Sequence, residues 1–448
     1  MNIKLVSPRM TLRPMDSEYK RRLAPSLSLL VLAALTPPEH TVYIEDENVR
    51  TISYDDSPDL VGINVNVDTS QRAYKIASHY RTRNIPVICG GIHASAVPDE
   101  ALLHANAVCI GEAETLWPQI LTDLAAGRLK REYYNDNPTD LATTPIPSWH
   151  LLDHSKYLYT NIVCTSRGCP FKCEFCYNSC DYMHNRYRNR PIENVLDEIN
   201  HLPTRELMFV DDNFAGNITW TNAFLDAIKP LNLRWHAAVS SNIATQLHLL
   251  DKMRDTGCES LFIGFESINK ASIRSVGKHQ NHIDRYEQLI REIHARGIMI
   301  NASMVFGFDH DYPDVFQNTL NWLIHNKIET MTAHILTPYP GTKLHQQLQR
   351  EGRIIDRDGT HYNTSSVVYT PMNMTREQLY KGYRWIYRQF YSYKNILKRL
   401  PEDRTQRLPY LLFNLIYRKH GKLTSQIARL GFMNALGKLA RRLSYGIE

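Results

Sequence analysis

Five of the eight cysteines in this chain lie in one short stretch, and this cluster limits what the chain can fold into more than any other feature. The clustered residues are Cys164, Cys169, Cys173, Cys176 and Cys180. Residues 1–12 lack the pattern of a signal peptide, so we expect a cytoplasmic protein. Disulfides are rare in that compartment, and a local group of cysteines there indicates a metal site.

The spacing within the cluster favours an iron–sulfur site. Cys169, Cys173 and Cys176 form Cys-x3-Cys-x2-Cys, a set of three thiolates that can hold a [4Fe–4S] cluster with one iron left open. Structural zinc usually takes four ligands in two pairs, and no second pair is present, although Cys180 is available as a fourth ligand. Zinc and free thiols remain the alternatives. The isolated Cys89, Cys109 and Cys258 are expected to be inert buried thiols.

Residues 1–135 alternate short apolar runs with helical patterns, which predicts a Rossmann-like parallel sheet with helices on both faces. Strands are expected at 2–6, 41–45, 60–65, 86–89 and 107–110, and helices at 26–35, 70–82 and 116–126. Residues 132–150 are polar and Pro-rich and are expected to hold no long element, so we place a linker at 136–157.

A second alternating series fills residues 158–350 and predicts a partial (β/α)6 barrel. Strands are expected at 158–165, 206–210, 234–239, 260–265, 299–306 and 331–336, and helices at 192–202, 219–229, 245–256, 282–296, 313–326 and 343–349. A complete barrel of eight units typically needs about 250 residues, more than are present. Chemistry in such folds sits at the carboxyl ends of the strands, and the cysteine loop follows the first strand.

Residues 351–448 are expected to form a mostly helical extension. The aromatic residues of 376–393 are expected to be helix core. Residues 393–448 hold 12 Lys and Arg against 3 Asp and Glu, and 427–443 reads as a basic amphipathic helix. That helix either packs on the barrel with a solvated basic face or makes peripheral contact with an anionic membrane. The barrel is not basic, so no nucleic-acid partner is expected.

The cysteine loop resembles the signature of the radical S-adenosylmethionine (radical SAM) superfamily, with Phe175 as the aromatic residue before the last cysteine. Three further segments resemble the second strand of that family, its fourth strand and the segment after its sixth: 209–214, 262–267 and 337–342. Residues 358–375 resemble the start of the C-terminal extension of one subgroup.

The first domain resembles the cobalamin-binding domain that is fused ahead of such barrels. The resemblance rests on residues 59–63, on 87–93 with Gly90, Gly91 and His93, and on 110–114 with Glu112. It implies bound cobalamin at these four residues. The motif Asp-x-His-x-x-Gly, whose His ligates cobalt from below, is absent. His93 is not that ligand, and an ordinary loop role for it, or a simple tight turn at the glycines, stays open.

The resemblance also implies roles in the barrel. Phe175, Ser240, Asn242 and Glu266 are expected to bind S-adenosylmethionine, with Glu266 on the ribose hydroxyls. Asp211 and Asp212 are expected to bind substrate or to orient an Arg. The alternatives are a strand-end salt bridge for Glu266, simple capping for Ser240 and Asn242, and capping or surface charge for the aspartates.

The implied activity is reductive cleavage of S-adenosylmethionine at the cluster to a 5′-deoxyadenosyl radical, used to methylate an unactivated carbon with cobalamin as the methyl carrier. The substrate is expected to be a small molecule, hydrophobic if the tail meets a membrane, and an electron donor such as flavodoxin or ferredoxin is required. The alternatives are a radical SAM oxidoreductase, cyclase or rearrangement enzyme without methyl transfer, and a non-catalytic cobalamin-binding or redox-sensing module.

Overall fold

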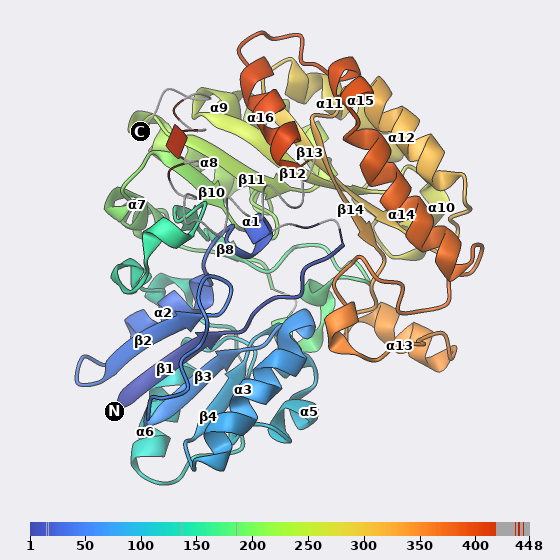
Figure 1. The fold of residues 1–448 in the computed structure, drawn as a ribbon. Helices are drawn as coiled ribbons and strands as arrows, with labels where there is room; N and C mark the ends of the chain where they lie inside the picture. Colours follow the sequence, from blue (N-terminus) through green and yellow to red (C-terminus); the bar gives the residue numbers. More distant parts are fainter. Residues whose placement is uncertain are drawn as a thin grey trace.

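Two six-stranded parallel sheets follow one another along the chain (Figure 1). The structure, a computed structural model, describes residues 1–14, 16, 18–135, 137–184, 186–417, 435, 438, 439 and 442. In Figure 1 the first sheet and its helices lie below, and the second sheet lies above.

The first sheet, sheet A, has the strand order β2-β1-β3-β4-β5-β6. Its strands are β1 (Asn2–Ser7), β2 (Thr41–Asp46), β3 (Leu60–Asn64), β4 (Val87–Gly90), β5 (Ala107–Ile110) and β6 (Glu132–Tyr134). Helices α2 (Leu27–Leu35) and α6 (Leu116–Ala125) enclose a hydrophobic core on one face. Helices α3 (Ser70–Thr82), α4 (Ile92–Ala96) and α5 (Pro98–Leu102) enclose a second core on the other. Cys89 and Cys109 are buried in these cores, as predicted.

Sheet A differs from the sequence prediction at one edge. The described residues of 132–150 form no long element, as predicted, but the first three form a short strand that was not predicted, β6, which pairs with β5. Tyr133 is buried, and its hydroxyl donates to Asp123 Oδ2 at 3.1 Å. Three residues are too few to display the alternation that marks a strand, and α4 and α5, with five residues each, were missed for a similar reason.

The second sheet, sheet B, has the strand order β14-β13-β12-β11-β10-β7 and is parallel throughout. Its strands are β7 (Ile162–Val163), β10 (Glu206–Phe209), β11 (Arg234–Val239), β12 (Cys258–Glu266), β13 (Met299–Phe306) and β14 (Thr330–Ile335). The intervening helices are α7 (Ile192–His201), α8 (Ile218–Ile228), α9 (Leu247–Asp255), α10 (Lys270–Ser275), α11 (Tyr286–His294), α12 (Val315–His325) and α13 (Lys343–Arg350). The six strands agree with the predicted partial barrel.

The first strand of sheet B is much shorter than expected. The predicted strand 158–165 is reduced to the two residues of β7. The chain then turns into β8 (Ser166–Arg167), which pairs antiparallel with β9 (Arg188–Asn189). This small hairpin spans the cysteine loop and fixes both of its ends.

The C-terminal extension covers the free edge of sheet B. Its helices are α14 (Arg376–Phe390), α15 (Tyr393–Lys398) and α16 (Arg407–Tyr417), so the predicted helix 376–393 ends earlier than expected. The predicted basic helix 427–443 lies outside the described residues, apart from 435, 438, 439 and 442. Across the described part of the chain, no helix has the length and apolar character needed to cross a membrane.

Two tyrosines of α14 and its C-terminus take the place of a neighbouring strand. The Tyr387 hydroxyl accepts from Ala333 N at 3.0 Å and donates to Ala333 O at 3.2 Å. Tyr391 does the same at Met331, at 3.0 and 2.7 Å. Both side chains are buried. At Met331 and Ala333 the outer edge of β14 therefore has its backbone groups satisfied by side chains, which protects this part of the edge from pairing with another chain.

We expect Tyr387→Phe and Tyr391→Phe each to lower the free energy of unfolding by about 1–3 kcal/mol, because each change keeps the packing but leaves buried backbone groups unpaired. Denaturant unfolding of the full chain measures this. Tyr380→Phe, in the same helix, is the matched control and should change stability by less than about 0.5 kcal/mol. Equal stability of all three variants and the parent chain would contradict the proposed role of the hydroxyls.

Candidate functional site

The cysteine loop begins at a buried carboxylate. Asp211 follows β10, and its Oδ1 accepts from Thr165 N at 2.9 Å, Thr165 Oγ1 at 3.0 Å, and Ser166 N and Oγ at 2.5 Å each. Its other oxygen, Oδ2, is buried without a hydrogen-bond partner among the described residues. Burial raises the pKa of Asp211 to about 6, although the four hydrogen bonds oppose the shift. Asp211 therefore holds the strand that leads into the loop, and among the described residues it makes no contact with an Arg.

The three cysteines of the predicted cluster lie on the loop that the β8–β9 hairpin encloses. Cys176 N donates to Cys173 O at 3.0 Å, and Gln280 Nε2 lies 3.4 Å from Cys173 Sγ. Burial, and then the neighbouring Cys173 thiol, raises the pKa of Cys169 to about 11 and that of Cys176 to about 12. The thiols are thus close enough to influence one another. Within the described residues, no three His, Cys, Asp or Glu side chains are grouped as ligands of one metal ion.

The other two cysteines of the cluster, Cys164 and Cys180, contact backbone and packed side chains. Cys180 is buried, and its Sγ faces Gly341, where an added Cβ would lie 3.3 Å away. Cys164 Sγ contacts Ser166 O at 3.0 Å. The structure therefore gives Cys180 a packing role in place of the fourth-ligand role that the sequence left open.

Glu266 ends β12 in an uncommon conformation beside the cysteine loop. Its φ is 62°, in the left-handed region, and the pairing of β12 with β13 shifts register between Gly264 and Glu266. The buried carboxylate pairs with Lys278 Nζ at 2.5 Å and accepts from Ser303 Oγ at 3.2 Å. Lys278 lies 5.8 Å from the centre of the Phe175 ring. A strained non-glycine residue at a strand end is typical of functional sites. The strand-end salt bridge that the sequence left open is present, and the ribose role stays a prediction.

Ser240 and Asn242 follow β11 at the same end of sheet B. Ser240 N donates to Asn213 Oδ1 at 3.3 Å. The side chains of Ser240 and Asn242 are half-buried. Phe175 packs against Phe308, with ring centres 6.2 Å apart. Sheet topology therefore brings Phe175, Ser240, Asn242 and Glu266 to the carboxyl edge of one sheet, and their contacts with S-adenosylmethionine stay predictions.

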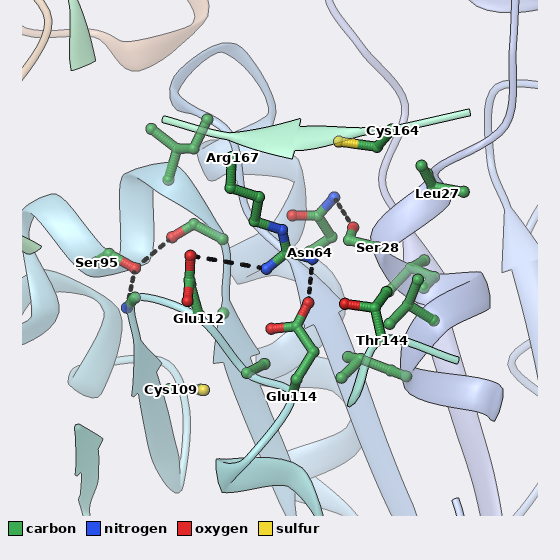
Figure 2. Close-up of a pocket in the computed structure, with 18 of the residues that line it drawn as sticks. Leu27, Ser28, Asn64, Ser95, Cys109, Glu112, Glu114, Thr144, Cys164 and Arg167 are labelled. Atoms are coloured by element: carbon green, nitrogen blue, oxygen red, sulfur yellow. Dashed lines mark hydrogen bonds and ion pairs between the residues drawn. The ribbon is translucent and has the colours of Figure 1, made fainter. Parts of the chain in front are cut away.

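A cavity of about 400 Å³ lies between the carboxyl edges of the two sheets (Figure 2). We call it the interdomain cavity. From sheet A and its helices it is lined by Leu27, Ile63, Ile88, Gly90, Gly91, Cys109 and Glu112. From the barrel side it is lined by Cys164, Ser166, Arg167, Tyr177, Arg190 and Asp212. Thr144 and Pro147 of the linker close one side. Most of the lining is apolar, which suits a large organic group.

An ion-pair network crosses this cavity and joins the two halves. Arg167 on β8 pairs with Glu114 and lies 3.9 Å from Glu112 Oε1 (Figure 2). Arg188 on β9 also pairs with Glu112 and donates to Thr139 O at 2.6 Å. Burial alone would raise the pKa of Glu112, but Arg188 and Arg167 keep this pKa below its usual value. Glu114, Arg167 and Arg188 were not predicted as site residues; only Glu112 was.

The other residues predicted for cobalamin divide between two places. Gly90 and Gly91 both line the interdomain cavity. Gly91 has φ 101°, and a Cβ there would lie 2.4 Å from Asn64 Oδ1, so its glycine is required by the fold itself. His93 is buried and its Nε2 lies 3.2 Å from Glu100 Oε1. His93 does not line this cavity but lines the larger cavity described below, and its role in cobalamin binding stays a prediction.

A larger cavity of about 850 Å³ runs along the concave face of sheet B. We call it the barrel cavity. Three residues line both cavities and form the wall between them: Ile92, Tyr177 and Val210. Tyr177 follows Cys176 directly, and its hydroxyl donates to Asp212. Burial raises the pKa of Asp212, and the bond from Tyr177 opposes the shift. Asp211 faces the barrel cavity and Asp212 the interdomain cavity, so the pair does not share one site.

Comparisons with known proteins identify two regions of the chain. Residues 163–323 match the radical SAM superfamily, and residues 342–434 match a domain of unknown function, DUF4070. The chain is similar to bacteriochlorophyllide d C-12(1)-methyltransferase of Chlorobaculum tepidum, with 30% identity over 84% of each protein. It is less similar to an anaerobic magnesium-protoporphyrin IX monomethyl ester cyclase of Rubrivivax gelatinosus, with 23% identity over 82% of this chain and 72% of the cyclase.

The fold is also similar to a solved structure. The cobalamin-dependent S-adenosylmethionine radical enzyme OxsB, determined with aqua-cobalamin and S-adenosylmethionine bound, superposes with a TM-score of 0.65. The match covers 97% of this chain and 75% of OxsB at 16% identity, so it concerns the fold alone.

We expect Asp211→Ala to lower the free energy of unfolding by about 3 kcal/mol and to reduce the iron bound per chain, because four donors at the start of the cysteine loop lose their acceptor. Denaturant unfolding and iron analysis after anaerobic reconstitution measure the two effects. Asp226→Ala removes an exposed carboxylate paired with Lys252 and should change neither by much. Full iron binding by Asp211→Ala would show that the loop does not depend on this anchor.

Proposed function

Since the chain belongs to the radical SAM superfamily, in the group of methyltransferases that includes the bacteriochlorophyllide enzyme, we propose that it methylates an unactivated carbon of a small molecule. The observation that carries the proposal is the pair of cavities that meet at the cysteine loop, separated by Ile92, Tyr177 and Val210. A methyl donor in one cavity and a substrate in the other would face each other across this wall.

We assign the cluster to Cys169, Cys173 and Cys176. The donor set fits a [4Fe–4S] cluster because the loop supplies three thiols, and the Gln280 amide reaches the sulfur of Cys173. When bound with S-adenosylmethionine, the cluster supplies one electron that breaks the S–C5′ bond and gives a 5′-deoxyadenosyl radical. The chain itself orients the loop through Asp211 and screens its charge with the buried Lys278. An external electron donor of the flavodoxin or ferredoxin class would supply that electron.

The carboxyl edge of sheet B would bind S-adenosylmethionine. Glu266 is held in one orientation by Lys278 and Ser303, so its carboxylate is ready to accept hydrogen bonds from the ribose diol. Ser240, Asn242 and Phe175 lie on neighbouring loops at the same edge. A fixed acceptor of this kind holds the bound group without further ordering when the reaction begins.

The interdomain cavity would bind cobalamin, which supplies a methyl group when it is bound as methylcobalamin. The cavity is lined mostly by apolar side chains and by Gly90, whose missing side chain leaves room above β4. Glu112 and Arg167 line it, where they can meet the polar groups of a large cofactor, and Arg188 holds Glu112 in place. We therefore assign the sheet A unit, residues 1–135, to cobalamin, residues 158–350 to radical chemistry, and residues 351–448 to the extension.

Methyl transfer is favoured over the alternative radical outcomes by the greater similarity to the methyltransferase than to the cyclase. The non-catalytic alternative gains no support, since the chain presents a second cavity of about 850 Å³ beside the cysteine loop. A module that only stores a cofactor has no use for such a cavity.

Replacing Cys169, Cys173 and Cys176 together by Ala should abolish both iron binding and the formation of 5′-deoxyadenosine, because the open-iron site loses all its ligands. Iron analysis and chromatography of the dithionite-reduced enzyme with S-adenosylmethionine measure the two losses. Cys258→Ala, a buried cysteine away from the loop, is the control and should keep both. Reductive cleavage of S-adenosylmethionine by the triple variant would overturn the proposal.

Gly90→Leu should lower the cobalamin bound per chain at least tenfold, because the added side chain enters the interdomain cavity. A Cβ at this position meets Cys109 at 3.6 Å, an ordinary contact, so the fold should tolerate the change. Cobalt analysis after anaerobic refolding with hydroxocobalamin measures the loss. Gly90→Ala is the matched smaller change and should bind more cobalt than Gly90→Leu. Iron content should stay at the wild-type level in both, and unchanged cobalt in Gly90→Leu would place the cofactor elsewhere.

A further inference from the structure

We propose that the barrel cavity takes a largely apolar molecule that carries an anionic group, and that Lys20 and Arg13 bind that group. The inference rests on the proposed function in one respect: the barrel cavity is taken as the place of the substrate. It adds the chemical class of that substrate and a part of the chain, outside the barrel, that selects it.

The selecting segment is the N-terminal strap, which we define as residues 8–14, 16 and 18–24. It leaves β1, crosses to the barrel and supplies six lining residues of the barrel cavity: Met10, Thr11, Arg13, Asp16, Lys20 and Leu23. Its path is fixed at both ends. Thr11 Oγ1 donates to Asp68 O at 3.0 Å, and the carbonyl oxygens of Arg22 and Leu23 each accept a backbone bond at 2.8 Å from residues 158 and 159. The strap therefore forms a wall of the cavity built by residues far from the barrel in sequence.

Most of the remaining wall is apolar. Leu158, Met208 and Val210 line one part, and Phe262, Tyr339 and Phe413 line another. Of these, Val210 and Phe262 are among the exposed large hydrophobic side chains of the described residues, at 40% and 36%. Apolar surface that faces a cavity of this size is stabilised when an apolar molecule removes it from water, at about 25 cal/mol per Å².

The strap places two cations at the wall of this cavity, and one of them forms no direct ion pair with another described residue. Arg13 pairs with Asp16 at 2.8 Å and donates to Thr364 Oγ1 at 3.0 Å. Lys20 lines the same cavity but makes no direct hydrogen bond or ion pair with another described residue. Lys20 is exposed as a residue, and desolvation of its ammonium, and then the positive charge of Arg13, lowers its pKa. An anion that joins this ammonium offsets the repulsion, by an amount that solvent screening limits at an exposed side chain.

Asp16 and Asp68 act on Lys20 electrostatically and partly raise its pKa, but neither forms an ion pair with it among the described residues. Asp16 pairs with Arg13, and burial raises the pKa of Asp68. His334 lines the cavity as well, but burial, and then Arg13 and Lys20, lowers its pKa to about 3, so it adds no positive charge at neutral pH. The cationic site is therefore confined to Arg13 and Lys20. A substrate held there by its anionic group would present a fixed part of its apolar body to Tyr177 and the cysteine loop.

Equilibrium dialysis of the full-length, cluster-loaded protein with two matched probes tests the proposal. 1-Pyrenebutyric acid has an apolar ring system with one carboxylate, and 1-pyrenebutanol has the same body without charge. The acid should bind at least tenfold more tightly, the ratio that one charge-assisted hydrogen bond of about 1.4 kcal/mol provides.

Lys20→Met should remove this ratio and weaken only the binding of the acid. Arg13→Gln should reduce the ratio, and Lys20→Arg should keep it. Lys229→Met, an exposed lysine on the barrel surface, is the control and should behave as the wild type.

Three results would overturn the inference: equal binding of acid and alcohol, a preference for the acid that survives in both Lys20→Met and Arg13→Gln, or binding of neither probe. Each is separable from the proposed function. Iron content and 5′-deoxyadenosine formation are measured on the same wild-type preparation, and a preparation that passes both while treating the two probes alike contradicts only the substrate class. A preparation without cluster or cleavage that still prefers the acid contradicts only the proposed function.

Discussion

The ion pairs between the loop after β5 and the β8–β9 hairpin are the interaction on which the arrangement of the site depends. Glu112 and Glu114 come from the first sheet, and Arg167 and Arg188 from the hairpin that encloses the cysteine loop. Glu112, Glu114 and both arginines are at most 28% exposed, so an unpaired partner would carry a large desolvation cost. These ion pairs therefore favour the arrangement in which the two carboxyl edges face each other. The contact between the two edges forms the interdomain cavity, which only a thin wall of side chains separates from the barrel cavity.

This arrangement explains how one chain can separate two reacting groups and still let them meet. The cysteine loop is anchored on one side by Asp211 and contacts the segment after α10 on the other, where Gln280 and Lys278 reach it. Tyr177, the next residue after the last cysteine of the triad, forms part of the wall between the cavities. A shift of the cysteine loop would therefore also shift Tyr177 and with it the wall between the two cavities.

The sequence predicted those parts of the fold that have a local signal. The spacing of Cys169, Cys173 and Cys176 is local, and so is the alternation that predicted six strands for sheet B. The three-residue β6 gave no periodic signal. Arg167 and Arg188 lie 53 and 76 residues from the glutamates they bind, and no spacing rule links such pairs. Asp211 and Asp212 were predicted to share one role because they are neighbours in the sequence. Successive residues at a strand end point to opposite sides, however, and these two face different cavities.

The tyrosines that cover β14 have a consequence for the size of molecule the fold can admit. A parallel barrel closes when further strands extend the sheet until its edges join, and β14 is the edge from which such growth would proceed. The hydroxyls of Tyr387 and Tyr391 occupy the hydrogen-bonding positions that a seventh strand would need. Closure is thereby arrested at six strands. A closed barrel fills its interior with its own side chains, whereas this six-stranded sheet leaves a cavity of about 850 Å³ along its concave face.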